Sequence, residues 1–327
     1  MAKKILITGG AGYVGVPLVE HLIKKGHKVT VLDLFLYGEE LLETSENLIK
    51  IKGDIRNQKL LKKIFLDQEI IIHLACISND PSFELNPVLG KSINLDAFEP
   101  MVKIAKDSGV KRFIYASSSS VYGIKNEKNV VEDMSLDPLT DYSKFKADCE
   151  KILLKYKSED FVTTIVRPAT VCGYSKRQRL DLVVNILSNL AYHKREITVF
   201  GGKQLRPNIH ISDMISFYDL LIDIEASKIN GEIFNAGFQN NTVSDLAEIV
   251  RKIIGNDVKI ISKNSDDNRS YHISSSKIFT QLKFSPSFKI EDAVSDLLHA
   301  FEKKLLFDPL NNIKYYNIKL MKNVNLE

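Results

Sequence analysis

A tyrosine and a lysine separated by one helical turn are the residues of this chain best suited to proton transfer. They lie in the segment DYSKFKAD, residues 141–148, in which Tyr142 is followed by Lys144 and Lys146. An α-helix turns about 100° per residue, so Lys146 lies about 40° from Tyr142 around the axis and Lys144 about 200° away. If the segment is helical, only Lys146 shares a face with Tyr142.

This pair suits the oxidation of an alcohol. A free tyrosine has a pKa near 10, so a phenolate base needs a positive charge close by, which Lys146 could supply. Tyr142 would take the proton of a hydroxyl while hydride leaves the same carbon for a nicotinamide, and Lys146 could also bind the nicotinamide ribose. The spacing is common by chance, so its meaning depends on the elements around it.

A glycine-rich loop near the N-terminus predicts a dinucleotide site. In LITGGAGYVG, residues 6–15, Gly9, Gly12 and Gly15 follow an apolar strand and open an amphipathic helix. Glycines at these positions let the backbone approach a pyrophosphate at the helix N-terminus. We expect Tyr13 and Val14 of the same loop to contact the cofactor.

Two acidic residues at the ends of the next strands define the expected cofactor more closely. Asp33 ends the second strand, where a carboxylate accepts hydrogen bonds from the adenosine ribose and repels a 2′-phosphate. No arginine follows it, so NAD is favoured over NADP. Asp54 and Ile55 follow the third strand and are expected beside the adenine.

Apolar runs alternate with amphipathic stretches in a strand–helix rhythm that predicts a Rossmann-type, doubly wound parallel α/β sheet. The expected strands are 3–8, 27–33, 47–53, 69–75, 111–117 and 161–167, with helices at 16–26 and 102–109. Further strands at 196–202 and 259–263 and helices at 243–255 and 290–304 predict a smaller C-terminal α/β lobe. We therefore expect an NAD-binding domain over 1–172, completed by segments from later in the chain, and a substrate-binding lobe over 173–327.

Composition argues against other classes of protein. The 45 Lys and Arg are scattered among 41 Asp and Glu, giving a net charge of +4. No basic stripe stands out that would argue for nucleic-acid binding. No apolar run approaches the roughly 20 residues of a membrane span. Three cysteines without metal-ligand spacing predict no metal site and a reducing compartment. Because the N-terminus leads directly into the first strand, we expect a cytoplasmic protein.

The motifs TGGAGYVG, HLA, SSSSVYG, DYSKFK and RP at 167–168, taken in this order, resemble the extended short-chain dehydrogenase/reductase superfamily in its NAD-dependent nucleotide-sugar epimerase/dehydratase branch. The resemblance covers essentially the whole chain. It implies that Ser118 donates a hydrogen bond to the reacting oxygen, with Ser119 beside the substrate. It also implies cofactor contacts from Leu74, Ala75 and Asn94.

The same resemblance implies a nucleotide-sugar substrate and places further residues against it. Arg206, in FGGKQLRPNIHISDM, matches an arginine that binds the diphosphate, and Arg269, in DDNRSYHISSSKI, matches a second one. Thr170 replaces the usual Asn in TVCG, and Arg179 lies in the basic stretch that follows; both are expected at the substrate. The family also implies a homodimer formed through the helix near 90–107 and the helix that carries Tyr142.

Several reactions remain open. Sugar 4,6-dehydratases carry an Asp-Glu pair after the hydroxyl residue, and here these positions are Ser119 and Ser120, which argues against dehydration. The expected reaction is oxidation of a sugar hydroxyl at C4, and a 4-epimerase or a 4-keto-sugar reductase are the alternatives. A non-catalytic NAD-sensing scaffold is disfavoured, because Tyr142 and Lys146 are both present.

Three segments resemble one subgroup within this branch. YSKRQRLDLVVN (174–185), SNDPSFELNP (78–87) and YYNIKLM (315–321) are similar to GDP-manno-heptose 4-dehydrogenases of capsule assembly. The resemblance implies a role in surface polysaccharide biosynthesis.

Overall fold

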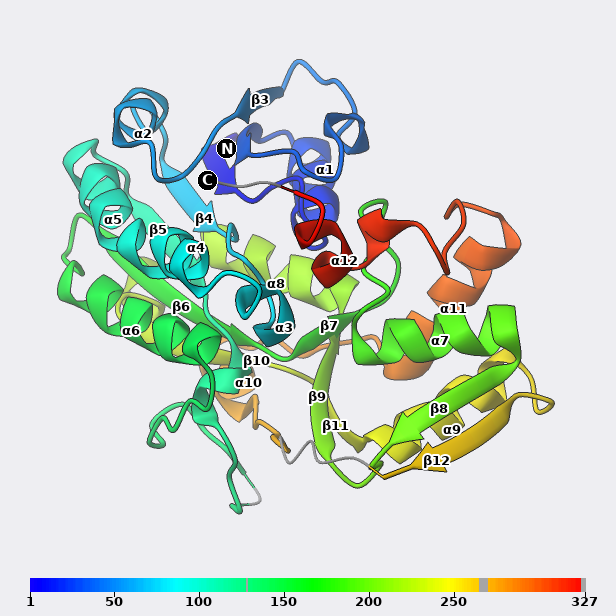
Figure 1. Ribbon diagram of the computed structural model, residues 1–327. Helices are drawn as coiled ribbons and strands as arrows, with labels where there is room; N and C mark the ends of the chain where they lie inside the picture. The colour runs from blue at the N-terminus through cyan, green and yellow to red at the C-terminus, as the bar shows by residue number, and fades with distance from the viewer. Residues whose placement is uncertain (128, 265–269, 325–327) are drawn as a thin grey trace.

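A seven-stranded parallel sheet forms the centre of the computed structural model, which describes residues 1–127, 129–264 and 270–324 (Figure 1). The strand order is β10-β6-β5-β4-β1-β2-β3. The strands are β1 (Lys4–Thr8), β2 (Lys28–Asp33), β3 (Leu48–Lys52), β4 (Ile70–His73), β5 (Arg112–Ala116), β6 (Val162–Pro168) and β10 (Glu232–Ala236). This arrangement confirms the predicted Rossmann-type fold class.

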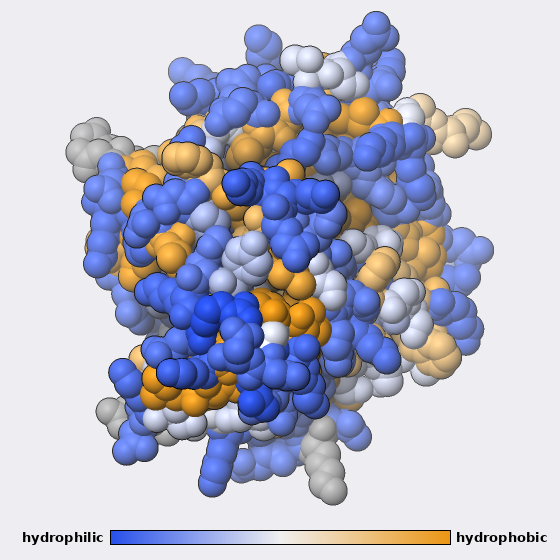
Figure 2. All heavy atoms as spheres, turned by 90° about the vertical axis from the view of Figure 1, so that its right-hand side faces the viewer, coloured by the Kyte–Doolittle hydropathy of each residue, from blue (hydrophilic) through white to orange (hydrophobic). Residues whose placement is uncertain are grey.

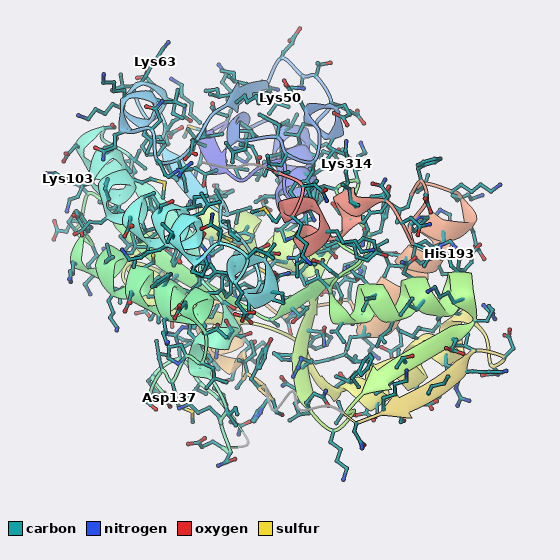
Figure 3. All side chains as sticks on the ribbon, viewed as in Figure 1. Lys50, Lys63, Lys103, Asp137, His193 and Lys314 are labelled. Atoms are coloured by element: carbon teal, nitrogen blue, oxygen red, sulfur yellow. The ribbon has the colours of Figure 1, made fainter. Side chains whose placement is uncertain are left out.

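Helices cover both faces of this sheet, because its strands are apolar on both sides. On one face α1 (Gly15–Lys24) packs beside α8 (Ile211–Asp223). On the other face α2 (Gln58–Ile64), α5 (Phe98–Asp107) and α6 (Asp141–Lys155) lie side by side. The polar sides of these helices face solvent, as Lys63 of α2 and Lys103 of α5 show in Figure 3.

The smaller lobe has its own apolar core. Its strands β8 (Glu196–Phe200) and β12 (Lys259–Lys263) pair in parallel and pack against α7 (Val183–Lys194), α9 (Val243–Ile254) and α11 (Ile290–Glu302). Figure 2 shows the outer side of this lobe as hydrophilic surface with scattered apolar patches.

A three-stranded sheet, β7 (Thr170–Cys172), β9 (Leu205–His210) and β11 (Gln239–Thr242), links the lobe to the large sheet. Between β9 and β11 the chain returns to the large sheet, where β10 pairs with β6. The domain limits at 172 and 173 stay a prediction.

The remaining elements are short. They are the helices α3 (Asp80–Phe83), α4 (Pro87–Lys91), α10 (Ser276–Leu282) and α12 (Asn317–Met321), the π-helical turn η2 (Ser92–Asp96), and the 3-10 turns η1 (Glu39–Leu41), η3 (Ser119–Tyr122), η4 (Ala226–Lys228) and η5 (Ile313–Tyr315). Among the described residues, no helix is both long enough and apolar enough to cross a membrane.

Candidate active site

A cavity of about 420 Å³ opens at the edge of the sheet where the parallel strands end. The carboxyl ends of parallel strands meet at one edge, so the loops after them converge there. The following predicted residues line this cavity: Gly9, Gly12, Tyr13, Val14, Gly15, Asp33, Asp54, Ile55, Leu74, Ala75, Ser118, Ser119, Tyr142, Lys146, Thr170 and Arg179. The structure therefore brings the predicted cofactor loop and the predicted catalytic residues to one place.

The glycine loop is packed too tightly for side chains at two of its positions. Gly9 has φ +75°, and a Cβ there would lie 2.6 Å from the backbone nitrogen of Ala75. A Cβ on Gly15 would lie 2.5 Å from the carbonyl oxygen of Gly9. The loop can therefore run close under a ligand at the start of α1, which fits the pyrophosphate of a dinucleotide.

Asp33 stabilises this loop while facing the cavity. Its carboxylate accepts hydrogen bonds from the amides of Ala11 at 2.9 Å and Phe35 at 2.8 Å. Burial raises the pKa of Asp33, and these two amides oppose the rise. Asp54 instead forms an ion pair with Arg56 at 2.7 Å and still lines the cavity.

Helix α6 places Lys146, and not Lys144, on the side of Tyr142 that faces the cavity. The helix begins after Thr140, whose hydroxyl oxygen accepts a hydrogen bond from the amide of Ser143 at 3.3 Å. Lys144 points outward and pairs with Asp141 at 3.1 Å. The Lys146 Nζ donates to the carbonyl of Ala116 at 2.6 Å and lies 5.9 Å from the centre of the Tyr142 ring.

The surroundings of Tyr142 favour the protonated phenol. Burial is the largest cause that raises its pKa well above the usual value, followed by Cys76 and Asp80, and the Arg179 guanidinium opposes them. Lys146 contacts the carbonyl of Ala116 here rather than the phenol oxygen, so its expected lowering of the Tyr142 pKa stays a prediction.

The serine run after β5 lines the cavity, with Ser117 and Ser119 buried and Ser118 and Ser120 half-buried. Ser117 is buried and its hydroxyl donates to Glu150. Ser118 is half-buried, and its oxygen accepts from the amide of Ser120 at 3.1 Å and lies 2.8 Å from the Ser120 hydroxyl. Because Ser117 is engaged with Glu150, Ser118 is the better placed donor for a substrate oxygen.

The residues expected at the substrate fall into two connected cavities. Thr170 and Arg179 line the large one, where Arg179 pairs with Asp181 at 3.0 Å. Arg206 lines a second cavity of about 140 Å³ and lies with its guanidinium 5.4 Å from the ring centre of Tyr271. The two cavities share Asp80, Ser120 and Tyr271. Arg269 lies outside the described residues.

Asn94 is hydrogen-bonded to a loop that borders the cavity. Its side chain accepts from the amide of Ile77 at 2.9 Å and donates to the carbonyl of the same residue at 3.0 Å. It thereby holds the backbone that follows β4, while Ile77 itself lines the cavity. A direct cofactor contact of Asn94 stays a prediction.

Several further residues line the cavity that were not predicted individually as site residues, although Asp80, Arg177, Asn317 and Met321 lie in the three segments that resemble the GDP-manno-heptose 4-dehydrogenases. They are Tyr37, Cys76, Asp80, Arg177, Tyr271, Asn317 and Met321, among others. Asn317 and Met321 belong to α12, near the end of the chain, and no motif spacing connects them with the glycine loop. Arg177 differs from Arg179 only by its place in the same basic stretch.

Comparisons with known proteins agree with this site. Residues 5–237 match the model of the NAD dependent epimerase/dehydratase family. UDP-glucose 4-epimerase of Lactobacillus helveticus is 27% identical over 312 residues, which cover 89% of this chain and 94% of that protein. UDP-glucuronic acid decarboxylase 1 of Arabidopsis thaliana is 29% identical over 320 residues, covering 93% and 71%.

A solved structure of a similar protein shows the same fold with ligands. UDP-glucuronic acid 4-epimerase from Bacillus cereus, in complex with UDP-glucuronic acid and NAD, is 27% identical and has a TM-score of 0.83. The alignment covers 92% of this chain and 99% of that one. Together with the glycine loop, Asp33 and the pair Tyr142 and Lys146, these matches show that the chain belongs to the NAD-dependent epimerase/dehydratase family.

Proposed function

We propose that this chain oxidises a hydroxyl, at C4, of a nucleotide-activated sugar. The observation that carries the proposal is that Ser118, Tyr142 and Lys146 line the same cavity as the glycine loop and Asp33. When bound there, NAD supplies a hydride acceptor. The alcohol and the cofactor would then meet beside Tyr142.

Each of the three residues has a distinct role in this reaction. Tyr142, as the phenolate, accepts the proton of the sugar hydroxyl, and its ring faces the cavity from the first turn of α6. Ser118 donates a hydrogen bond to the same sugar oxygen and orients it. Lys146 lowers the pKa of Tyr142 through its charge and binds the nicotinamide ribose.

The positions next to Ser118 argue against sugar dehydration. Ser119 is buried and Ser120 is hydrogen-bonded to Ser118, and neither hydroxyl can remove a carbon-bound proton or protonate a leaving hydroxide well. Oxidation without loss of water is therefore the reaction that the site supports best.

A 4-epimerase is the second candidate, in which the hydride returns to the other face of the transient ketone. The 27% identity with UDP-glucose 4-epimerase over 89% of the chain favours it. A 4-keto-sugar reductase would use the same residues in the opposite direction. Within the first candidate, the three segments described above favour GDP-manno-heptose as substrate and capsule polysaccharide synthesis as the process.

The test is mass spectrometry of a panel of nucleotide sugars, including GDP-manno-heptose and UDP-glucose, after incubation with the purified protein. A product lighter by two hydrogens, formed together with NADH, is the expected result for the dehydrogenase. A product of unchanged mass and altered stereochemistry, without net NADH, would assign the epimerase. If no sugar on the panel changes while NAD binds normally, the proposed reaction is wrong.

We also infer a homodimer that buries helices α5 and α6, which lie side by side on one face of the sheet. The support is the family resemblance alone. Light scattering of the purified chain at several concentrations measures its mass directly, and a monomer throughout would contradict the inference.

A further inference from the structure

Helix α12, near the C-terminus, forms part of the wall of the cofactor cavity. Helix α12 (Asn317–Met321) packs on α3 and contributes Asn317 and Met321 to the cavity lining. In Figure 1 this red helix lies near the middle of the molecule, beside the ends of the central strands. Met321 also packs against the apolar core between the sheet and α5.

Asn317 is the central residue of this contact. It is 4% exposed, and its side chain makes three hydrogen bonds. Its Oδ1 accepts from the Tyr37 hydroxyl at 3.1 Å and from the Arg177 Nη2 at 2.7 Å. Its Nδ2 donates to the Ser78 hydroxyl at 2.8 Å, and its backbone amide donates to Asp181 at 3.1 Å. We call Asn317, Tyr37, Arg177 and Ser78 the Asn317 bridge.

The strand order places the glycine loop between the two ends of this bridge. Tyr37 follows β2 and Ser78 follows β4, and β1 lies between β2 and β4 in the sheet. The glycine loop follows β1. The Asn317 bridge therefore joins the two loops on either side of the glycine loop, and all of its members line the same cavity.

Arg177 gives the bridge an unusual charge. Its side chain is buried at 3% exposure, its guanidinium stacks 3.4 Å from the centre of the Tyr37 ring, and its Nε has no hydrogen-bond partner in the described part of the chain. Within the same residues no carboxylate pairs with it, whereas Arg179 is paired with Asp181. Asp181 and Asp33 attract this buried cation without forming an ion pair with it among the described residues, and a bound phosphate group would supply a closer counter-charge.

We propose that Asn317 is a positioning residue that holds α12 against the cavity that would take NAD, so that release of the dinucleotide is slowed. On this proposal, opening of the bridge on one side precedes release of a dinucleotide from the glycine loop. Asn317 also fixes Arg177 in the lining of the cavity that would take the cofactor. This inference rests on NAD binding and is independent of which sugar reacts.

The test is the rate at which prebound NADH leaves the full-length protein when an excess of NAD is added, followed by NADH fluorescence. Asn317→Leu keeps the size of the side chain and removes its three side-chain hydrogen bonds, so release should become at least tenfold faster. Asn323→Leu is the matched control: Asn323 is exposed in the same segment, and its side chain donates to the carbonyl of Lys319. Its release rate should equal that of the unmodified protein.

A second variant covers the case in which Asn317→Leu does not fold. Tyr37→Phe removes a single hydroxyl from the bridge and should speed release about two- to tenfold, the effect of one neutral hydrogen bond. A merely structural role predicts lower melting temperatures without cofactor and unchanged NADH release in both variants. That result would overturn the proposal, as would unchanged release in Tyr37→Phe alone. Because no sugar is needed, failure here is distinct from failure of the proposed reaction.

Discussion

At the scale of single residues, the proposed chemistry depends on which of two lysines of α6 lies beside Tyr142. Lys146 faces the cavity beside Tyr142, and Lys144 pairs with Asp141 on the surface. Removing the charge of Lys146 should leave the phenol harder to ionise. We therefore expect Lys146→Met to shift the pH–rate profile of sugar oxidation upward by about one pH unit or more.

Lys144→Met is the matched control for this prediction, since it removes the same charge from the same helix. Its pH–rate profile should coincide with that of the unmodified protein. Equal shifts in the two variants would mean that net charge, and not the position of Lys146, sets the profile.

Tyr142→Phe tests the proton acceptor itself. Without the phenol oxygen, hydride transfer to NAD should fall by about 10²- to 10⁴-fold, the usual contribution of a positioned acid–base group. NAD affinity, measured by titration, should change little. Tyr156→Phe is the control, because Tyr156 follows the far end of α6 and its hydroxyl contacts Glu99 at 3.1 Å. Hydride transfer at the original rate in Tyr142→Phe would rule out the mechanism.

At the scale of elements, a buried ion pair fixes α6 against the sheet. Glu150 of α6 and Arg167 of β6 are 2.6 Å apart, and each side chain is 3% exposed. Arg167 also donates to the Tyr122 hydroxyl at 2.7 Å, and Ser117 donates to Glu150. The pair thereby joins the helix of Tyr142 to the serine run after β5.

Breaking this pair should cost more than breaking a surface pair of the same type. Glu150→Ala leaves the Arg167 guanidinium buried without its partner, so the free energy of unfolding should fall by about 3–5 kcal/mol. Lys151→Ala removes the exposed pair with Asp148 on the same helix and should cost about 0–1 kcal/mol. Denaturant unfolding of both variants gives the comparison, and equal losses would contradict it.

Local patterns located most elements of the large sheet closely. The first six strands lie within the predicted ranges to within about one residue, because buried parallel strands are continuous apolar runs. Strand β10 was not predicted. It pairs with β6 in the register of Glu232 with Thr164, 68 positions earlier, so its place in the sheet depends on a distant contact. Helix α5 begins at Phe98, earlier than predicted, because Pro100 is tolerated in a first turn.

At the scale of the whole molecule, stability should depend on pH through His73. It ends β4 and is buried against Phe98 and Tyr115, and its Nδ1 lies 2.6 Å from the Thr8 hydroxyl. Burial lowers the pKa of His73 to about 3, whereas the unfolded chain binds a proton near pH 6.5. This contribution to stability is therefore complete above pH 6.5 and is lost as the pH falls toward 3.

His73→Phe removes the titrating group and keeps an aromatic ring. Between pH 6.5 and 4.5 the unmodified protein should lose about 2 kcal/mol of unfolding free energy more than this variant does. His299→Asn, at an exposed position of α11, should follow the unmodified protein. Urea unfolding at both pH values measures the difference, and parallel losses in His73→Phe would show that His73 is not the source.

The sequence by itself determined the parallel sheet, the glycine loop and the facing of Lys146 toward Tyr142. These features depend on short-range periodicity: two residues per repeat along a strand, 3.6 along a helix, and glycines where a backbone must come close. The resemblance to the nucleotide-sugar branch added Ser118, which the structure places in the cavity.

Only the tertiary structure decided which distant residues complete the site. Asn317 meets Tyr37 and Ser78 across 280 and 239 positions of the chain, and Arg177 rather than its neighbour Arg179 is left without a carboxylate among the described residues. Such contacts form when separately folded segments pack together. They leave no periodic pattern in the sequence, because which residues meet depends on how the distant segments pack against one another.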